Sequence, residues 1–380
     1  LRSRVRPHPL FPDQSAEEAS RHAFYRDLKE LVTAEVKPRI RERYQSLLAP
    51  AHAARKGRPP ESTAEVGAVV APDPAWRWYS ALARAQHELY VDATAECVER
   101  QAGALTDRCR ALREADGPGS LRLDPSLQLP DYQSRVDIHC VPGGYFAELA
   151  DDDVYAGARY ELGISLYTLG RHGALNDSKG RTGVAFLRER FPDFAPRRIL
   201  DLGCTCGNST LPYAAAWPAA EVHGVDLSAP ALRYAHARSR ALGQAVHYRQ
   251  ADATATGYPD GHFDLVVSHI LMHEVSADAL RAVLAESHRL LAPGGVMLHV
   301  EVPVRNALLD PFERFMADWD TDNNNEPFWH ALHELDLPAL VAAAGFPPGA
   351  VFDLDYDGGA RAFINNRPWW LFGARRGGGR

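Results

Sequence analysis

The sequence has few of the features on which several classes of protein depend. It contains five cysteines in 380 residues, too few and too scattered for the disulfide framework of a small secreted protein. Its 42 basic residues are outnumbered by 49 acidic ones, which argues against a protein that coats nucleic acid with a basic face. No apolar run approaches the roughly 20 residues that span a bilayer, and the first residues lack the apolar core of a secretory signal. We therefore expect a cytoplasmic protein that contacts neither nucleic acid nor a membrane.

What the sequence does contain is typical of a folded globular protein. Hydrophobic residues make up 46% of it and charged residues 24%. The length predicts two domains, or one domain with a large extension. The patterning divides it into an N-terminal helical domain over residues 1–117, a connecting and cover segment over residues 118–196, and a ligand-binding domain over residues 197–380.

The N-terminal region is predicted to be helical. A capping box at residues 15–18 precedes apolar residues at helical spacing, which predict a helix to about residue 48. Pro38 is expected to kink or divide this helix. The stretch over residues 49–65 is typical of a linker, and a second helical region is predicted from Asp73 to Arg113.

From residue 199 onward, short apolar runs alternate with helical segments. The runs are ILDLG, EVHGVDL, AVHYRQAD, FDLVVSHI and VMLHVEV. Strand–helix alternation with short connections predicts a mostly parallel sheet with helices on both faces. A polar insertion over residues 303–330 follows. The last two apolar runs, AVFDLDY and PWWLFGA, could then close the sheet edge as a hairpin.

The stretch RRILDLGCTCGNSTL predicts a strand, a tight turn and a helix, which is the usual ligand-binding place in such a sheet. The turn lacks the G-x-G-x-x-G spacing of a dinucleotide loop. Asp201 suits an amino-acid ammonium and would repel a phosphate. Asp226, closing the second strand, can accept hydrogen bonds from both ribose hydroxyls, and Asp252 after the third strand suits an adenine amine. An amino acid, a ribose and an adenine together describe S-adenosylmethionine.

Five motifs in order resemble the class I S-adenosylmethionine-dependent methyltransferases, most strongly the group that contains ubiquinone and menaquinone methyltransferases and many natural-product enzymes. The motifs are ILDLGCTCGNST, HGVDLS, ADAT, FDLVVSHILMHEV and LLAPGGVMLHVEV. The resemblance implies an α/β fold with a Rossmann-like, seven-stranded, mostly parallel sheet whose last strand is antiparallel. It also implies S-adenosylmethionine as cofactor and S-adenosylhomocysteine as product.

The resemblance also implies which residues hold the cofactor. One position departs from the family's D-x-G-x-G-x-G loop, because Thr205 stands at the middle glycine. The residues carried over are Asp201, Gly203, Cys204, Thr205, Gly207 and Asn208 around the methionine part, Asp226 and Leu227 at the ribose, Asp252 and Ala253 at the adenine, and Ser268 with His269 beside the sulfonium.

No metal site is expected. Cys204 and Cys206 lack the second ligand pair of a zinc site, and a disulfide between them would be strained, so we interpret both as small wall residues. Asp318, Asp320 and Asp322 fit three positions of a calcium loop, but its glycine and its bidentate acid are replaced. The insertion is instead interpreted as a polar lid with Trp319, Phe328 and Trp329 as apolar walls. A magnesium-dependent site stays open as an alternative.

Candidate catalytic residues follow the fourth and fifth strands or lie in the cover segment. They are His269, His273, Glu301, Tyr145 and Tyr160. Histidine suits a general base for an alcohol or phenol because its pKa lies near working pH. Two alternatives stay open: His273 caps or packs beside the adenine, or the tyrosines pack the helical domain onto the sheet.

These features lead to an expected function. We expect methyl transfer to an oxygen or nitrogen of a small molecule, in natural-product or secondary metabolism. The alternatives are an enzyme that uses the same cofactor for other chemistry, such as a cyclisation, or a catalytically silent partner subunit. A homodimer through the N-terminal helical region is a further expectation. The acceptor itself cannot be named, because acceptor pockets are built from segments outside the shared motifs.

Overall fold

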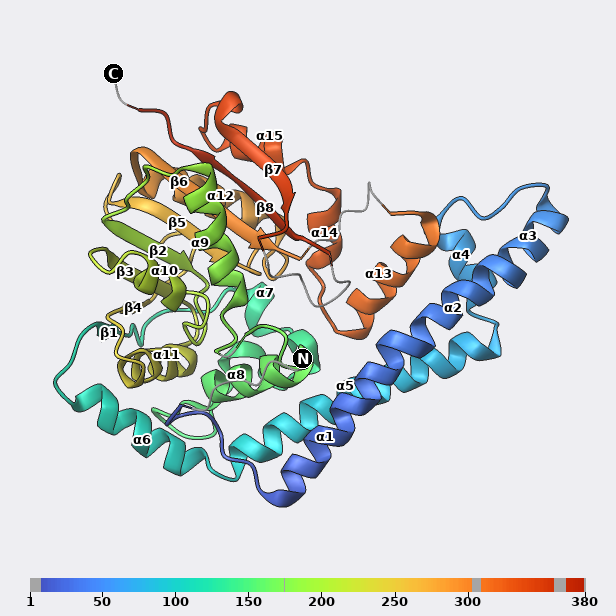
Figure 1. The fold of residues 1–380 in the computed structure, drawn as a ribbon, viewed down its shortest axis with the longest axis horizontal. Coiled ribbons are helices and arrows are strands. Elements are labelled where there is room, and N and C mark those ends of the chain that lie inside the picture. The colour runs from blue at the N-terminus through green and yellow to red at the C-terminus, as the bar shows by residue number, and fades with distance from the viewer. Residues whose placement is uncertain (1–7, 174, 303–308, 359–366, 379–380) are drawn as a thin grey trace.

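The computed structural model describes residues 8–173, 175–302, 309–358 and 367–378. At its centre lies an eight-stranded sheet (Figure 1). The strands are β1 (Ser120–Arg122), β2 (Arg198–Leu202), β3 (Glu221–Asp226), β4 (His247–Gln250), β5 (Phe263–His269), β6 (Leu291–Glu301), β7 (Val351–Tyr356) and β8 (Trp369–Arg375). Their order across the sheet is β1-β4-β3-β2-β5-β6-β8-β7.

The pairing of these strands confirms the predicted fold class. β1 to β6 pair in parallel, whereas β8 runs antiparallel to both β6 and β7. The seven expected strands are β2 to β8, and the last two form the hairpin at one edge. The eighth strand, β1, lies at the other edge beside β4. It has only three residues, which is too short a stretch to show a strand periodicity in the sequence.

Two layers of helices cover the sheet. α9 (Ser178–Arg190), α10 (Leu211–Ala216) and α11 (Ala229–Ala241) cover one face, and α12 (Ala277–Leu290) and α15 (Leu337–Ala343) cover the other. Two adjacent residues of β5 face opposite sides of the sheet. Val267 lies in the same buried cluster as Leu187 of α9, whereas Val266 lies in the same cluster as Leu284 of α12. Burial on both faces explains why the central strands are continuously apolar rather than alternating.

The N-terminal helix is longer than the sequence predicts. A continuous helical run contains α1 (Ala16–Leu31), a π-helical turn (Val32–Val36), α2 (Lys37–Arg43), a second π turn (Tyr44–Leu48) and α3 (Ala49–Lys56). Pro38 therefore does not divide the helix. It lies in the first turn of α2, directly after a wide π turn, where its ring and missing N–H are tolerated.

The predicted linker over residues 49–65 is also corrected, because much of it is helical. Its alanine-rich first half forms α3, which ends at Gly57 in the left-handed conformation at φ 77°. Alanine has the highest helix propensity, which outweighs the proline at residue 50 when that proline falls in the first turn. Ser62 then caps α4 (Thr63–Val70) by accepting a hydrogen bond from the Glu65 N–H.

The second helical region begins as predicted but consists of two helices. Asp73 caps α5 (Pro74–Glu99) by accepting from the Ala75 N–H, and α6 (Ala102–Glu114) follows after a short break. Figure 1 shows α1, α2 and α5 running side by side from below the sheet toward α13 (Pro311–Asn323).

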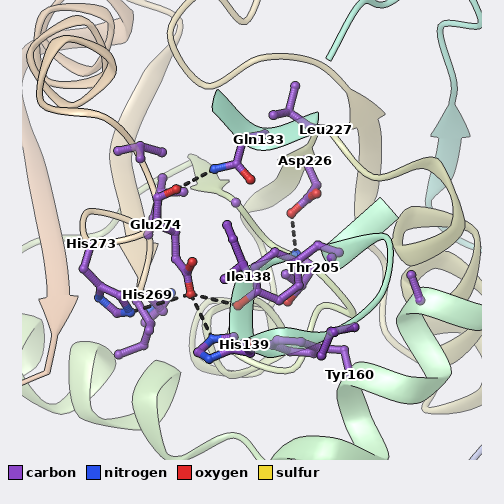
Figure 2. Close-up of a pocket in the computed structure, with 18 of the residues that line it drawn as sticks. Gln133, Ile138, His139, Tyr160, Thr205, Asp226, Leu227, His269, His273 and Glu274 are labelled. Carbon is purple, nitrogen blue, oxygen red and sulfur yellow. Dashed lines mark hydrogen bonds and ion pairs between the residues drawn. The ribbon is translucent and has the colours of Figure 1, made fainter. Parts of the chain in front are cut away.

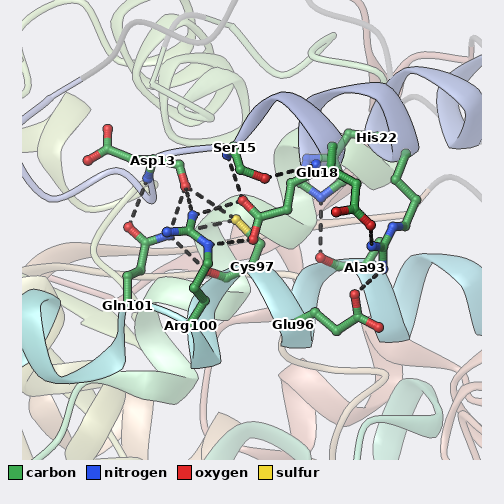
Figure 3. Close-up of polar contacts among 11 residues, drawn as sticks. Asp13, Ser15, Glu18, His22, Ala93, Glu96, Cys97, Arg100 and Gln101 are labelled. Carbon is green, nitrogen blue, oxygen red and sulfur yellow. Dashed lines mark hydrogen bonds and ion pairs between the residues drawn. The ribbon is translucent and has the colours of Figure 1, made fainter.

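A polar cluster fastens the start of α1 to the end of α5 (Figure 3). The Glu18 carboxylate accepts hydrogen bonds from Arg100 Nε at 2.7 Å and from the Ser15 N–H at 2.7 Å, which also completes the predicted capping box. The hydrogen bond from Arg100 lowers the pKa of Glu18 to about 2. Gln101 holds the chain before the helix by bonding both the N–H and the carbonyl of Asp13.

A buried ion pair joins the cover segment to the sheet layer. The Glu161 carboxylate on α8 (Tyr155–Tyr167) accepts from Arg238 Nε of α11 at 2.8 Å and from the Tyr234 hydroxyl at 2.7 Å. His8 Nε2 lies 3.0 Å from the same carboxylate. Burial raises the pKa of Glu161, but Arg238 and His8 outweigh burial and bring it to about 2.

The polar insertion is ordered as helices where the structure describes it. α13 packs Phe312 and Met316 against the N-terminal helices, and α14 (Trp329–Glu334) follows it. Since Asp318, Asp320 and Asp322 lie on α13, they cannot form the loop of the calcium template. No three His, Cys, Asp or Glu side chains in the described ranges are grouped for a metal ion. Across the same ranges, no helix is long and apolar enough to cross a membrane.

Candidate active site

A cavity lies at the carboxyl edge of the sheet, where β2, β3, β4 and β5 end. Residues after these strands form one side of the cavity. The other side comes from the cover segment, α5, α8 and the loop before α14. Among the predicted site residues, the cavity is lined by Gly203, Thr205, Asp226, Leu227, Asp252, Ala253, His269, His273, Tyr145 and Tyr160. The predicted cofactor and catalytic sets therefore meet in one cavity.

The turn after β2 has the backbone that a close ligand approach requires. Gly203 and Gly207 have φ values of 69° and 74°, which only glycine adopts without strain. A side chain at Gly203 would also come within 2.8 Å of Leu271. Thr205, at the family's middle glycine, has a φ of 42°, and its N–H donates to Asp226 Oδ2 at 2.9 Å.

Asp226 lies at the end of β3 with its carboxylate oriented by the backbone. One oxygen accepts from the Thr205 N–H (Figure 2), and the other accepts from the Ser228 N–H at 2.8 Å. A carboxylate has about four acceptor positions, so each oxygen can accept one further hydrogen bond. Burial raises the pKa of Asp226 to about 6. These features suit the binding of two vicinal hydroxyls.

Asp252 is positioned for a single further hydrogen bond. Its Oδ1 accepts from both the N–H and the hydroxyl of Thr254 at 2.7 Å. No described residue donates to its Oδ2. Leu227 and Ala253 form the apolar wall beside it. This combination of an acceptor and apolar surface fits the edge and face of a base.

The remaining predicted residues lie behind the cavity surface. They are Asp201, Cys204, Gly207, Asn208, Ser268 and Glu301. The Asp201 carboxylate, 1% exposed, accepts from the Thr210 hydroxyl at 2.6 Å and lies 3.3 Å from His269 Nδ1. These two contacts position the loop and His269. A direct contact between the Asp201 carboxylate and the ammonium of a ligand stays a prediction. Cys204 and Cys206 are buried free thiols, and burial raises the pKa of Cys206 to about 12.

His269 faces the cavity but both of its ring nitrogens are engaged. Nδ1 lies beside Asp201, and Nε2 lies 3.0 Å from the hydroxyl of Tyr213, which is fully buried. A base needs a nitrogen within reach of the proton that it removes. The contacts therefore give His269 a structural role in this arrangement.

His273 forms a buried ion pair with Glu301. Its Nδ1 lies 2.7 Å from Glu301 Oε2, and Glu301 Oε1 accepts from the Met272 N–H at 2.7 Å. Burial lowers the pKa of His273, but the charge of Glu301 outweighs burial and raises it to about 9. Trp329 stacks on the ring with centroids 4.7 Å apart. His273 is therefore an imidazolium at neutral pH and a hydrogen-bond donor.

Glu274 lies between His273 and a second histidine, His139, which the sequence did not indicate. Its Oε1 lies 3.7 Å from His273 Nε2. Its Oε1 accepts from the Tyr145 hydroxyl at 2.8 Å and lies 3.3 Å from His139 Nε2 (Figure 2). His139 Nδ1 lies 3.1 Å from Glu326 Oε1 on the opposite side of the ring. Burial lowers the pKa of His139, but the two glutamates outweigh burial and hold it well above its usual value.

The two predicted tyrosines line the cavity side by side. Tyr145 and Tyr160 meet edge to face with centroids 5.9 Å apart. Burial raises the pKa of both hydroxyls, so both remain protonated and act as donors. Of the three apolar walls expected from the insertion, Trp329 lines the cavity, whereas Trp319 packs against Trp76 and Tyr79. Phe328 packs on Tyr132 beside the cavity.

Lys179 is a further cavity residue that the sequence analysis missed. It lies in the first turn of α9 and is 3% exposed. Burial lowers the pKa of its amine to about 8, while Cys206, Glu301 and Asp201 act in the opposite direction. No carboxylate of a described residue lies within ion-pair distance of it. A buried amine without a counter-ion is suited to an anionic group of a ligand.

Part of the sequence resembles known methyltransferases. Residues 199–295 match the family model described as a methyltransferase domain. A demethylmenaquinone methyltransferase from Thermus thermophilus is 40% identical over 109 residues, which cover 29% of this chain and 49% of the relative. A trans-aconitate 2-methyltransferase from Methylobacterium radiotolerans is 41% identical over 173 residues, covering 45% of this chain and 60% of the relative. The chain thus spans about half the length of these curated relatives.

One solved structure with a similar fold is phosphoethanolamine N-methyltransferase 2 from Haemonchus contortus, in complex with phosphomonomethylethanolamine and S-adenosylhomocysteine. It is 18% identical, the match covers 58% of each chain, and the TM-score is 0.44.

Proposed function

Since residues 199–295 form a methyltransferase domain of the class I, S-adenosylmethionine-dependent family, we propose that the protein transfers a methyl group from S-adenosylmethionine to an oxygen or nitrogen of a small molecule, in natural-product or secondary metabolism. The observation that carries this proposal is the orientation of Asp226, whose two oxygens are each fixed by one backbone N–H and face the cavity.

The cofactor half of the cavity has one group for each part of the proposed cofactor. Asp226 would accept from the ribose hydroxyls, Asp252 from the adenine amine, and Lys179 would pair with the carboxylate of the methionine part. The sulfonium supplies an activated methyl group when the cofactor is bound. The role of this chain is then to hold the acceptor atom in line with the methyl group and to exclude water, which can supply a large share of the barrier reduction.

The acceptor half of the cavity supports an oxygen or nitrogen acceptor because it can orient a polar group. Tyr160 and the His273 imidazolium are donors, Glu274 and Glu326 are acceptors, and the Tyr145 hydroxyl already donates to Glu274. The relatives named above act on different acceptors, so they do not decide this point.

The proposal is tested by turnover with a panel of phenols, carboxylic acids and amines. We expect release of S-adenosylhomocysteine and a product heavier by one methylene group. Asp226→Asn should lose the activity, whereas the matched control Asp278→Asn should keep it, because Asp278 is exposed on α12. A product of unchanged composition would favour a cyclisation instead. Binding of the cofactor without any turnover would favour a silent partner subunit.

A further inference from the structure

Glu326 has one carboxylate oxygen that the protein leaves without a donor. The residue lines the cavity from the loop between α13 and α14 and is 3% exposed. Its Oε1 lies 3.1 Å from His139 Nδ1, but its buried Oε2 accepts no hydrogen bond from any described residue. A buried carboxylate oxygen without a donor is costly, and such groups normally have a partner. A ligand in the cavity is positioned to supply it.

The charges around Glu326 favour a positively charged partner. Three buried carboxylates, Glu274, Glu301 and Glu326, face two imidazolium groups, His139 and His273. The carboxylates therefore outnumber the cations that contact them. Two further cations line the cavity, but neither forms an ion pair with these carboxylates: Lys179 has no carboxylate within ion-pair distance among the described residues, and Arg159 donates to the Val91 carbonyl at 3.1 Å.

The walls near Glu326 are aromatic. Tyr145 and Tyr167 both line the cavity and interact electrostatically with Glu326. Trp329 lines the same side; its backbone N–H donates to the Glu326 carbonyl at 3.3 Å, and its ring stacks on His273 and His333.

We propose that the acceptor molecule carries a protonated amine, which the Glu326 carboxylate binds through Oε2. This inference rests on the proposed function and names the class of acceptor for the same cavity. The amine is a recognition group and not the methylated atom, because a protonated nitrogen has no lone pair with which to attack the methyl group. An acceptor with a carboxylate at this place would be repelled by the same three glutamates.

The test uses three probes of similar shape that differ in one group: 2-phenylethylamine, 2-phenylethanol and 3-phenylpropanoate. Their affinities are measured by calorimetry or by ligand-observed NMR on the full chain saturated with S-adenosylhomocysteine. We expect the amine to bind at least tenfold more tightly than the alcohol, and the acid most weakly. Glu326→Gln should reduce amine binding to that of the alcohol and leave alcohol binding unchanged. The matched control Glu17→Gln, at an exposed position of α1, should behave like the wild type.

The inference is overturned if wild-type protein binds the amine no better than the alcohol, if no amine binding is detected, or if the preference survives in Glu326→Gln. Should Glu326→Gln fail to fold, the wild-type comparison decides the question. Binding of S-adenosylhomocysteine is measured first on the same sample. Normal binding of it without an amine preference rejects this inference and leaves the proposed function intact. Absence of that binding rejects the proposed function, and the probes are then compared on the free protein.

Discussion

Replacing Glu301 with glutamine should remove the charge that keeps His273 protonated. The pKa of His273 is about 9 against an ordinary value of 6.5. At about 1.36 kcal/mol for each pKa unit, that difference corresponds to about 3 kcal/mol in favour of the imidazolium. Burial acts in the opposite direction. Glu274 and Glu326 also raise the pKa of His273, but Glu301 contributes most, so loss of the Glu301 charge should lower the pKa well below 9.

The geometry of the Glu301→Gln variant leads to the same expectation. The glutamine oxygen can still accept from the Met272 N–H, which leaves the amide nitrogen toward His273 Nδ1. An amide N–H donates, so His273 must then accept and be neutral. At pH 7.5 the wild-type ring should therefore be mostly protonated and the ring of the variant largely neutral.

The assay is an NMR titration of protein with isotope-labelled histidine rings, with His273→Gln identifying the signal of interest. We expect a midpoint near pH 9 in the wild type and a midpoint well below pH 9 in Glu301→Gln. Circular dichroism before the titration confirms that the variant is folded. A wild-type midpoint near 6.5, or a midpoint that Glu301→Gln leaves in place, would show that the ion pair does not control this histidine.

Four further predictions concern binding, stability and assembly. Asp226 should bind the ribose as a carboxylate, and its pKa in the free protein is about 6. Calorimetry should therefore show the affinity for S-adenosylhomocysteine falling as pH drops below about 6. An affinity that stays constant from pH 5 to 8 would contradict this role. Lys179→Met should weaken S-adenosylhomocysteine at least tenfold but leave 5′-methylthioadenosine, which lacks the carboxylate, unchanged, whereas an equal loss for both ligands would indicate a structural role. Glu161→Ala should cost about 3–5 kcal/mol of unfolding free energy, since it leaves Arg238 buried and unpaired. Because the pKa of Glu161 is lowered to about 2, the wild type should lose this stabilisation as pH falls from about 4.5 toward 2. A loss under 1 kcal/mol for Glu161→Ala in urea unfolding would refute the prediction. A homodimer through the N-terminal helices should bury Trp78, which is 77% exposed, so Trp78→Ser should shift a dimer to monomer in light scattering, and a wild-type monomer would reject the dimer.

The sheet and the cofactor half of the site could be predicted because their signals are local. Each central strand is a short apolar run that ends in a polar residue. Parallel strands bring their carboxyl ends to one edge, so Asp226 and Asp252 had to meet the turn after β2. The same reasoning placed Asp201 near this edge, but it could not show that Thr210 and His269 already engage its carboxylate.

The acceptor half could not be predicted because it depends on contacts between distant segments. His139 and Glu326 are far apart in the sequence and lie in stretches without periodicity, yet they form one ion pair. Lys179 follows a polar stretch and carries no local signal of burial. The helix over residues 49–56 was missed for a different reason. A proline and a following Gly-Arg-Pro-Pro run are typical of a linker, and a preceding turn of π-helix, which has no sequence signature, made the helix possible.

The central claim is that the cavity at the carboxyl edge of the sheet binds S-adenosylmethionine through the turn after β2. Calorimetric titration of S-adenosylhomocysteine into wild type and Gly203→Val tests it most directly, because valine at φ 69° is strained and would contact Leu271. We predict one-to-one binding to the wild type and none to a folded Gly203→Val. No binding to the wild type, or equal binding to both proteins, would contradict the claim.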